Sequence, residues 1–186
     1  MGEPAVGSAI ERFMAQARET MARGDGPAMR EEIGRHLSAL ARSGVISVDL
    51  ARSRLHGSDA RFTILARDPD GPILMLSRFP EHEATRVHDH KSWGVACVVN
   101  GRDRHLHWRR LDDGSAPGRA RVAVDDEREL GEGEYVHWGD PPDDIHSQQG
   151  VGGAVYELVF FGRDPMVVMR NYFDPDRGTV REEMPA

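Results

Sequence analysis

The sequence contains a single cysteine, Cys97, among its 186 residues, so it can form no internal disulfide bond. It also lacks any apolar run approaching the roughly 20 residues that a membrane-spanning helix requires. Lys and Arg total 24 against 31 Asp and Glu, the net charge is −7, and the two signs are interspersed without a basic stripe. We therefore expect a protein that binds neither nucleic acid nor membrane.

The N-terminal residues Met1-Gly2-Glu3-Pro4 also lack the basic and apolar regions of a secretory signal. Together with the near absence of cysteine, this predicts a cytoplasmic protein. The hydrophobic content of 39% and the charged content of 30% are ordinary for a globular domain. The length suits a single domain over residues 1–186, in either a monomer or a homodimer.

Two helices are expected at the start of the chain. Ser8 and Glu11 form a capping box, and apolar residues recur at helical spacing over 8–23. A second amphipathic stretch covers 28–43 and ends at Gly44. The segment 1–45 is therefore expected to be helical and to pack against a sheet.

The region 60–175 has a different pattern, in which short segments of β-forming residues alternate with Gly- and Pro-rich turns. This pattern predicts a mainly β sandwich or barrel. The expected strands cover 61–66, 73–79, 94–99, 105–110, 121–124, 135–138, 155–161 and 166–173. Asn100-Gly101 predicts a tight hairpin after the strand 94–99, and residues 174–186 are expected to form a loose tail.

The motif His88-Asp89-His90 is the strongest chemical signal in the chain. Residues i and i+2 of a strand point to the same face, so both imidazoles would enter one cavity. His146, which follows a Pro-containing turn, can supply a third imidazole. Three histidines cover one face of a metal ion and leave positions open for substrate and O₂. A second such motif, His105 and His107, has no evident partner and is expected to face solvent.

These motifs resemble the cupin family, whose fold is a double-stranded β-helix, or jelly-roll, barrel. The resemblance covers about residues 60–175 and rests on His88, His90, Gly101, Gly133, Pro141 and His146. Most cupins place a glutamate ligand four residues after the second histidine, but here that position is Gly94. Within the cupins, the sequence is therefore most similar to the thiol dioxygenases, which include cysteine dioxygenase and 3-mercaptopropionate dioxygenase.

The resemblance implies an Fe(II) cofactor held by His88, His90 and His146. The implied reaction adds both atoms of O₂ to the sulfur of a small thiol or thione and gives a sulfinate. Spacing alone does not name the metal, because Zn²⁺ also binds three histidines. Two other functions remain open: a three-histidine cupin that cleaves carbon–carbon bonds of diketone-like substrates, and a non-catalytic cupin that binds a small molecule.

The chain departs from the thiol dioxygenases in its substrate residues. Ile64 follows Arg61-Phe62-Thr63, where cysteine dioxygenase has its carboxylate-binding arginine, so Arg78 or Arg86 is a candidate replacement. The family also carries a Ser-x-His-x-Tyr triad on the strand after the third ligand. Alignment on the terminal glycine puts Glu157, Val159 and Phe161 at those positions, and a shift by one puts Phe160 at the tyrosine.

Glu157 is the candidate catalytic carboxylate, because a charge is costly to bury in an apolar strand unless it has a role or a partner. Trp93, Tyr156 and Phe161 are candidate substrate contacts beside it. An acidic, aromatic pocket favours a cationic thiol or thione such as ergothioneine. A mercaptocarboxylate such as mercaptosuccinate, 3-mercaptopropionate or cysteine is the alternative, and a salt bridge to an arginine is the structural alternative for Glu157.

Overall fold

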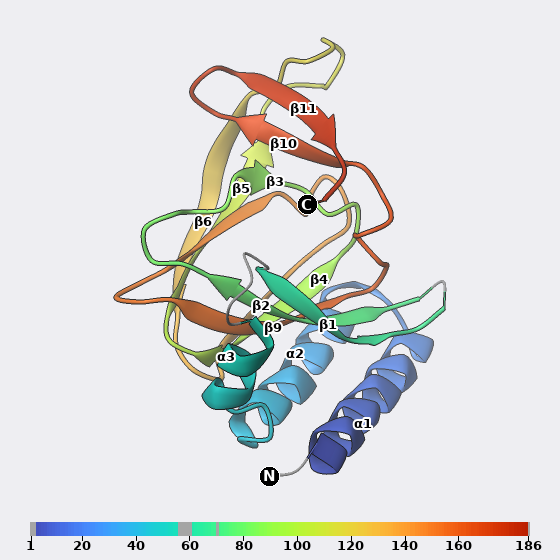
Figure 1. The fold of residues 1–186 in the computed structure, drawn as a ribbon. Coiled ribbons are helices and arrows are strands. Elements are labelled where there is room, and N and C mark those ends of the chain that lie inside the picture. Colours follow the sequence, from blue (N-terminus) through green and yellow to red (C-terminus); the bar gives the residue numbers. More distant parts are fainter. Residues whose placement is uncertain (1–2, 56–60, 70, 186) are drawn as a thin grey trace.

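The computed structural model describes residues 3–55, 61–69 and 71–185, and its path is shown in Figure 1. Three helices come first: α1 (Glu3–Ala22), α2 (Gly26–Arg42) and α3 (Val48–Leu55). The strands are β1 (Phe62–Arg67), β2 (Ile73–Phe79), β3 (Val87–His88), β4 (Gly94–Asn100), β5 (Asp103–Arg110), β6 (Val122–Leu130), β7 (Tyr135–Trp138), β8 (His146–Gly150), β9 (Val155–Phe161), β10 (Arg170–Asp174) and β11 (Thr179–Glu183).

The strands form two antiparallel sheets. One has the order β1-β2-β9-β4-β7, and the other has the order β11-β10-β3-β8-β5-β6. Strands that follow one another in the sequence often belong to different sheets, as β3, β4 and β5 do, so the chain repeatedly crosses between them. The result is a jelly-roll barrel, and the predicted mainly β fold is confirmed.

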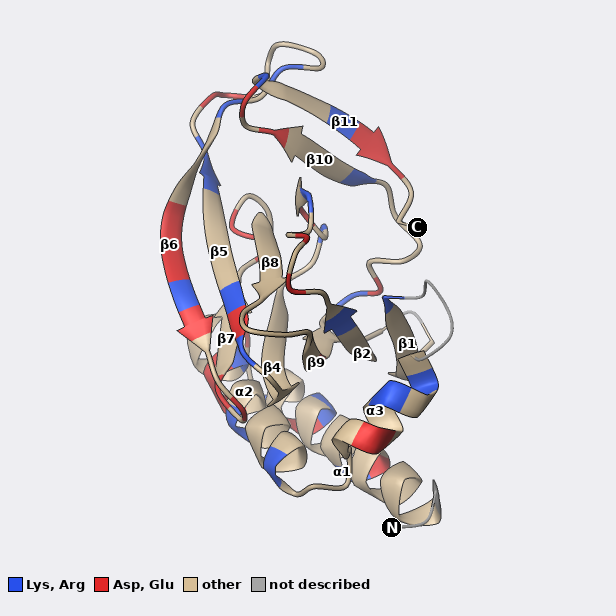
Figure 2. Cartoon of the chain, turned by 60° about the vertical axis from the view of Figure 1, so that its left-hand side comes forward, with Lys and Arg blue, Asp and Glu red and all other residues tan. Residues whose placement is uncertain are grey.

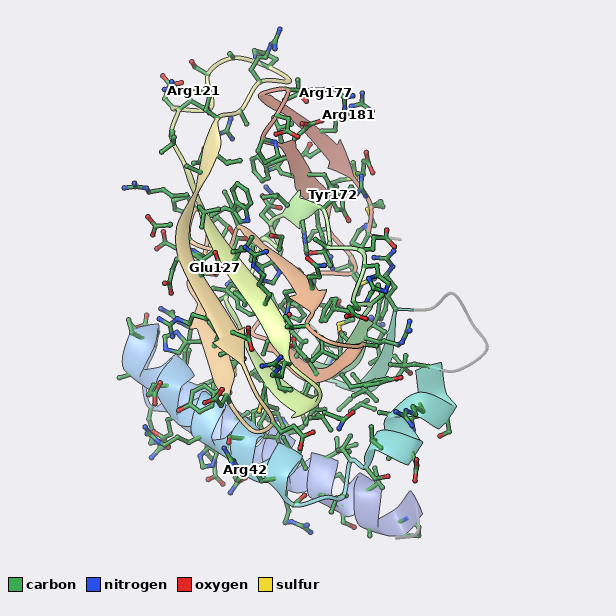
Figure 3. All side chains as sticks on the ribbon, turned by 90° about the vertical axis from the view of Figure 1, so that its left-hand side faces the viewer. Arg42, Arg121, Glu127, Tyr172, Arg177 and Arg181 are labelled. Atoms are coloured by element: carbon green, nitrogen blue, oxygen red, sulfur yellow. The ribbon has the colours of Figure 1, made fainter. Side chains whose placement is uncertain are left out.

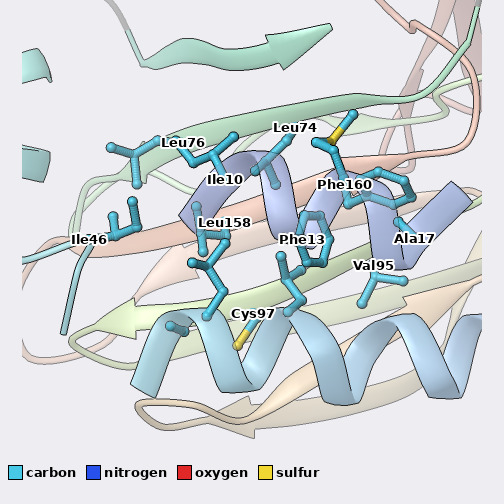
Figure 4. Packing of buried hydrophobic residues seen from close by; sticks show 14 of the residues in the cluster. Ile10, Phe13, Ala17, Ile46, Leu74, Leu76, Val95, Cys97, Leu158 and Phe160 are labelled. Carbon is cyan, nitrogen blue, oxygen red and sulfur yellow. The ribbon is translucent and has the colours of Figure 1, made fainter. Parts of the chain in front are cut away.

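Helices α1 and α2 cover the outer face of the first sheet (Figure 1). Phe13 of α1 is buried with Leu158 and Phe160 of β9 (Figure 4), and Leu37 of α2 belongs to the same cluster. The ring centroids of Phe13 and Phe160 are 5.4 Å apart in an edge-to-face arrangement. Burial of one such side chain contributes about 1.5–3 kcal/mol, so this layer is a major part of the core.

The outer surface of the second sheet is charged, with acidic residues along β6 facing basic residues on β5 (Figure 2). Arg104 and Glu127 lie 2.7 Å apart across these strands, and Arg109 and Asp125 lie 3.3 Å apart. Such exposed pairs contribute little to stability but keep the edge strand polar. No helix in the described ranges is long and apolar enough to cross a bilayer.

Several local predictions were wrong. The first helix begins at Glu3, before the capping box at Ser8, and α3 was not anticipated. Asn100-Gly101 is not a hairpin, because β4 and β5 lie in different sheets and Gly101, with φ 93°, turns the chain between them. The expected loose tail contains β11, which pairs with β10. The expected barrel start at residue 60 lies outside the described residues.

Candidate metal centre

Three histidines converge inside the barrel. His88 lies on β3 directly opposite His146 on β8, and His90 is the second residue after the end of β3. The three ring centroids form a nearly equilateral triangle with sides of 4.6, 4.7 and 4.8 Å. One ligand nitrogen from each residue lies within 4.8 Å of the others, and all three side chains are buried. This arrangement can place three nitrogen ligands on one face of a cation.

Two carboxylates fix the loop that carries His90. The Asp144 carboxylate accepts hydrogen bonds from the backbone N–H groups of His90 and Lys91, at 3.0 and 2.7 Å. Asp89 points the other way and accepts from the backbone N–H and the side-chain amide of Asn171, at 2.9 and 2.7 Å. These bonds hold the left-handed backbone of Lys91, with φ 56°, and so orient the imidazole of His90.

The three imidazoles are neutral at physiological pH. Burial lowers the pKa of His88 to about 4, and it lowers the pKa of His90 and of His146 well below the usual 6.5. The His88 Nδ1–H donates to the backbone carbonyl of Arg86 at 2.7 Å, which leaves the Nε2 lone pair free to bind a metal. A backbone carbonyl behind a ligand histidine is a common arrangement in metal sites.

The donor set fits a divalent transition metal. The Nε2 atoms of His90 and His146 are only 2.7 Å apart, so their two lone pairs and that of His88 would point at nearly the same volume. A cation there would turn this repulsion into coordination, and neutral imidazole is a normal ligand for iron, zinc and copper. His88, His90 and His146 would hold the ion.

A glutamate ligand could not be added at Gly94. A Cβ atom there would lie 2.3 Å from Cζ2 of Trp138. The Trp138 indole stacks on His90 with ring centroids 5.9 Å apart and lies 4.8 Å from the ring of His146. Trp138 therefore occupies the space that a fourth protein ligand would need, and it supports two of the three histidines.

The histidines border a cavity of about 380 Å³ between the two sheets. One wall is apolar and includes Met75 on β2 and Val159 and Phe161 on β9. The Phe161 ring centroid is 4.6 Å from that of His90, so Phe161 lies next to the metal centre. The cavity also has polar lining residues: Arg61, Ser77, Glu83, Thr85, Arg86, Gln148, Arg170 and Tyr172.

Strand β10 contributes a guanidinium, from Arg170, and a phenol, from Tyr172, to the cavity lining. Tyr172, labelled in Figure 3, pairs with His88 in the sheet, and their rings stack with centroids 5.8 Å apart. The guanidinium of Arg86 covers the Tyr172 ring at 3.6 Å. Arg170 is only 8% exposed, and burial lowers its pKa, although the guanidinium remains charged at neutral pH.

Glu157 points into the barrel but does not line the cavity. It is fully buried behind Gln148, whose side-chain N–H donates to Glu157 Oε2 at 2.7 Å. Burial and the nearby Asp103 carboxylate raise the pKa of Glu157 well above its usual value. The alternation of side chains along β9 correctly predicts that Glu157 shares the inward face with Val159 and Phe161. Glu157, however, lies nearer the start of the strand and deeper in the barrel than these two residues.

The other predicted substrate residues lie on the wrong side of the sheet. Tyr156 and Trp93 belong to the apolar layer beneath the helices, and the Trp93 ring packs 5.9 Å from that of Phe160. Arg78 is paired with Tyr156 and shares the parity of Leu76, which is buried in the same layer. Strand alternation therefore directs all these side chains away from the cavity.

His105 and His107 also depart from expectation. His105 is 2% exposed, with its ring 5.0 Å from that of His146 and its Nδ1 3.6 Å from Asp103. His107 is half-buried, and its Nε2 lies 3.1 Å from the carbonyl of Asp143. The expectation that both face solvent was therefore wrong for His105, because β5 runs beside β8 with this face toward the barrel interior.

No protein-family model and no curated protein sequence matches the chain. Solved structures do match. The DMSP lyase DddQ from Ruegeria pomeroyi is 15% identical with a TM-score of 0.50, over 94% of this chain and 99% of that one. A cupin superfamily protein from Desulfitobacterium hafniense is 16% identical with a TM-score of 0.43, over 62% of this chain and 88% of that one.

An oxalate decarboxylase variant from Bacillus subtilis matches at 17% identity and a TM-score of 0.38, over 59% of this chain; the chain spans only 24% of that protein. The chain spans 52% of a further DMSP lyase structure. At these identities the likeness concerns the fold alone. The protein has a double-stranded β-helix, or jelly-roll, fold, with a three-histidine site suited to a metal cofactor.

Sequence reasoning missed Arg170, Tyr172 and Gln148 as cavity residues. Gln148 had a usable signal, because it lies two residues after His146 and must share its face of the strand. Arg170 and Tyr172 fall in a segment whose strand was expected over 166–173, but nothing in the sequence shows that this strand lies beside β3. That neighbour relation exists only in the folded barrel.

Proposed function

We propose that this protein is an Fe(II)-dependent dioxygenase that converts a small thiol bearing a carboxylate into the corresponding sulfinate. The balanced reaction is RSH + O₂ → RSO₂⁻ + H⁺, in which sulfur is oxidised and both oxygen atoms join it. The observation that carries the proposal is the convergence of His88, His90 and His146, buried and neutral, on a cavity that also contains the buried Arg170.

Fe(II) held by the three imidazoles would supply adjacent open coordination positions and the redox chemistry with O₂. The chain's own residues set the environment. Met75, Val159 and Phe161 keep one wall apolar and limit access of water to the reacting sulfur. The neutral histidines add no negative charge, so the positive charge of the site favours the thiolate form of a bound thiol.

The cavity favours an anionic substrate over a cationic one. Arg61 and Arg86 line it but are paired with Glu83 and Glu183, each at 2.9 Å. Arg170 forms no ion pair among the described residues: its Nε donates to the Pro165 carbonyl at 3.4 Å, and its Nη2 lies 3.3 Å from Sδ of Met166. Its charge can therefore attract a substrate carboxylate, whereas Glu157 does not line the cavity and is not placed to attract an ergothioneine-like cation.

The test is oxygen uptake by the iron-loaded protein with a panel of compounds: 3-mercaptopropionate, cysteine, mercaptosuccinate, ergothioneine and pentane-2,4-dione. We expect uptake with mercaptocarboxylates and one sulfinate formed per O₂ consumed. Uptake with the diketone alone would indicate carbon–carbon cleavage instead. Tight binding of a thiol without uptake would indicate a binding protein.

Matched histidine variants test the metal centre. His146→Ala removes one ligand and should abolish iron retention and oxygen uptake. His137→Ala changes a half-buried histidine on β7 that does not line the cavity, and it should keep its iron. Metal content measured by plasma emission spectrometry gives the answer. Full iron content in His146→Ala would contradict the proposed ligand set.

A further inference from the structure

Behind the cavity lies a buried polar cluster that the proposed reaction does not use. It consists of Asp103 on β5, Gln148 on β8 and Glu157 on β9, with exposures of 0%, 3% and 0%. Two carboxyl groups at this depth cannot both be charged without a large desolvation cost. The basic group closest to them within the described residues is His105, with its Nδ1 3.6 Å from Asp103.

The hydrogen bonds indicate where the shared proton lies. Asp103 Oδ1 accepts a hydrogen bond from the backbone N–H of Gln149 at 3.2 Å, so this oxygen already has a donor. Glu157 Oε1 is buried and has no donor within reach. As a protonated O–H, this oxygen can donate to the Asp103 carboxylate, which removes the unsatisfied group. Burial and Asp103 both raise the pKa of Glu157, in agreement with this assignment.

This carboxyl pair fixes the orientation of the Gln148 amide. Its Nε2 lies 2.7 Å from Glu157 Oε2 and 3.4 Å from Asp103 Oδ2, so both amide hydrogens are used. The flipped amide would turn its carbonyl oxygen toward the Asp103 carboxylate and is electrostatically unfavourable. The backbone is held as well, since Gln148 donates to Thr85 Oγ1 at 2.9 Å and accepts from the Thr85 N–H at 2.8 Å.

The side-chain nitrogen of Gln148 therefore donates its hydrogen bonds away from the cavity. The side-chain carbonyl oxygen of Gln148 is the polar atom that can face a ligand in the cavity. Gln148 and His146 project from the same face of β8, and both line the cavity. The alternation is visible at Ser147, which turns outward and accepts a hydrogen bond from the Trp108 indole at 3.0 Å.

We propose that Gln148 is a specificity-determining residue that presents a hydrogen-bond acceptor to the substrate. It favours thiols that carry an amine or hydroxyl close to the sulfur over matched thiols without a donor. This inference rests on the proposed thiol chemistry and deepens it. Arg170 would bind the carboxylate of such a substrate, and Gln148 would recognise the donor on the intervening carbon.

The experiment compares binding of three probes to the zinc-substituted protein by calorimetry, where no turnover occurs. The probes are 3-mercaptopropionate, cysteine and 2-hydroxy-3-mercaptopropionate, which differ only at the carbon next to the carboxylate. Gln148→Met keeps the length of the side chain but removes the acceptor. It should reduce the preference for the two donor-bearing thiols by about tenfold, the effect of losing one buried hydrogen bond.

The matched control is Gln149→Met, the same substitution one residue along β8. The Gln149 amide donates to the carbonyl of Glu81 rather than facing the cavity, and the variant should retain the wild-type preference. An unchanged preference in Gln148→Met, or an equal loss in Gln149→Met, would overturn the inference. Because binding is measured, failure of the dioxygenase proposal appears separately, as absence of oxygen uptake by the iron-loaded enzyme.

If Gln148→Met fails to fold, the role of Gln148 can still be tested with the wild-type protein. In a crystal structure of the zinc-substituted protein with cysteine, the Gln148 carbonyl oxygen should lie within about 3.2 Å of the amine nitrogen. A clearly longer separation, or an amine bound by another residue, would contradict the proposed role.

Discussion

The two faces of strand β9 show how one segment can serve two different purposes. On one face, Tyr156, Leu158 and Phe160 belong to the apolar layer beneath α1 and α2. On the other face, Val159 and Phe161 line the metal cavity, and Glu157 lies in the polar cluster behind it. All seven residues of the strand are buried, so burial alone does not distinguish the faces.

The difference lies in what each face contacts. The helix face packs mainly against apolar side chains and contributes to stability through close packing. The barrel face meets imidazoles, an amide and a guanidinium, so its side chains affect binding and charge. A substitution should therefore act mainly on folding on one face and mainly on ligand recognition on the other.

The adjacent residues Phe160 and Phe161 give the sharpest test of this division. Phe160→Ala opens a hole beside Phe13 and should lower the free energy of unfolding by about 3–5 kcal/mol. Phe161→Ala enlarges an existing cavity and should cost clearly less, about 1–2 kcal/mol. Denaturant unfolding followed by circular dichroism measures both. Equal losses would show that the two faces are packed alike.

Two arginines extend the comparison to activity. Arg170→Gln removes the cavity guanidinium and should lower kcat/KM for mercaptocarboxylates about 100-fold, since a buried charge-assisted bond is lost. Arg78→Gln alters the face of β2 that carries Leu76, away from the cavity, and should leave kcat/KM almost unchanged. Steady-state oxygen uptake compares them. A similar loss in both variants would contradict Arg170 as the anion-binding residue.

Glu157 tests the polar part of the barrel face through pH. Its pKa is raised in the fold, so the folded state holds a proton that the unfolded state releases above its ordinary value of 4.5. Folding stability from this group therefore falls as pH rises from 4.5 toward the raised pKa. Glu157→Gln removes that dependence while keeping a similar shape.

At pH 8 the Glu157→Gln variant should therefore melt above the wild type by about 2–4 °C, the shift that about 1 kcal/mol produces in a domain of this size. The advantage should shrink at pH 5, where the wild-type carboxyl is protonated more readily in both states. Melting curves at the two pH values measure the difference. A constant gap would argue against a proton held by Glu157.

Cys97 gives the smallest expected effect. It lies on β4 within the helix-facing layer (Figure 4), and burial raises the pKa of its thiol to about 12. The native protein should therefore not react with a thiol reagent at pH 8, whereas the unfolded chain should show one reactive thiol. Rapid labelling of the native protein would place Cys97 nearer solvent than the structure does.

Strand alternation explains why some of the predicted site residues lie at the cavity and others do not. The spacing of His88 and His90 predicts a shared strand face. In the structure β3 ends at His88, but the three histidines still meet around one point. For Trp93, Arg78 and Tyr156, the parity was also readable, but the sequence does not say which face looks inward when both are apolar. The helices cover the outer face of the first sheet, and this packing is known only from the tertiary structure.

The sequence by itself determined the local patterns: helices near the start, short strands with turns after them, and a pair of closely spaced histidines at the end of one strand. Only the tertiary structure decided that β10 lies beside β3, which brings Arg170 and Tyr172 to the histidines, and that Glu157 lies behind Gln148. The physical reason is that strand period fixes directions along one segment, whereas strand order across a sheet depends on long-range pairing and packing.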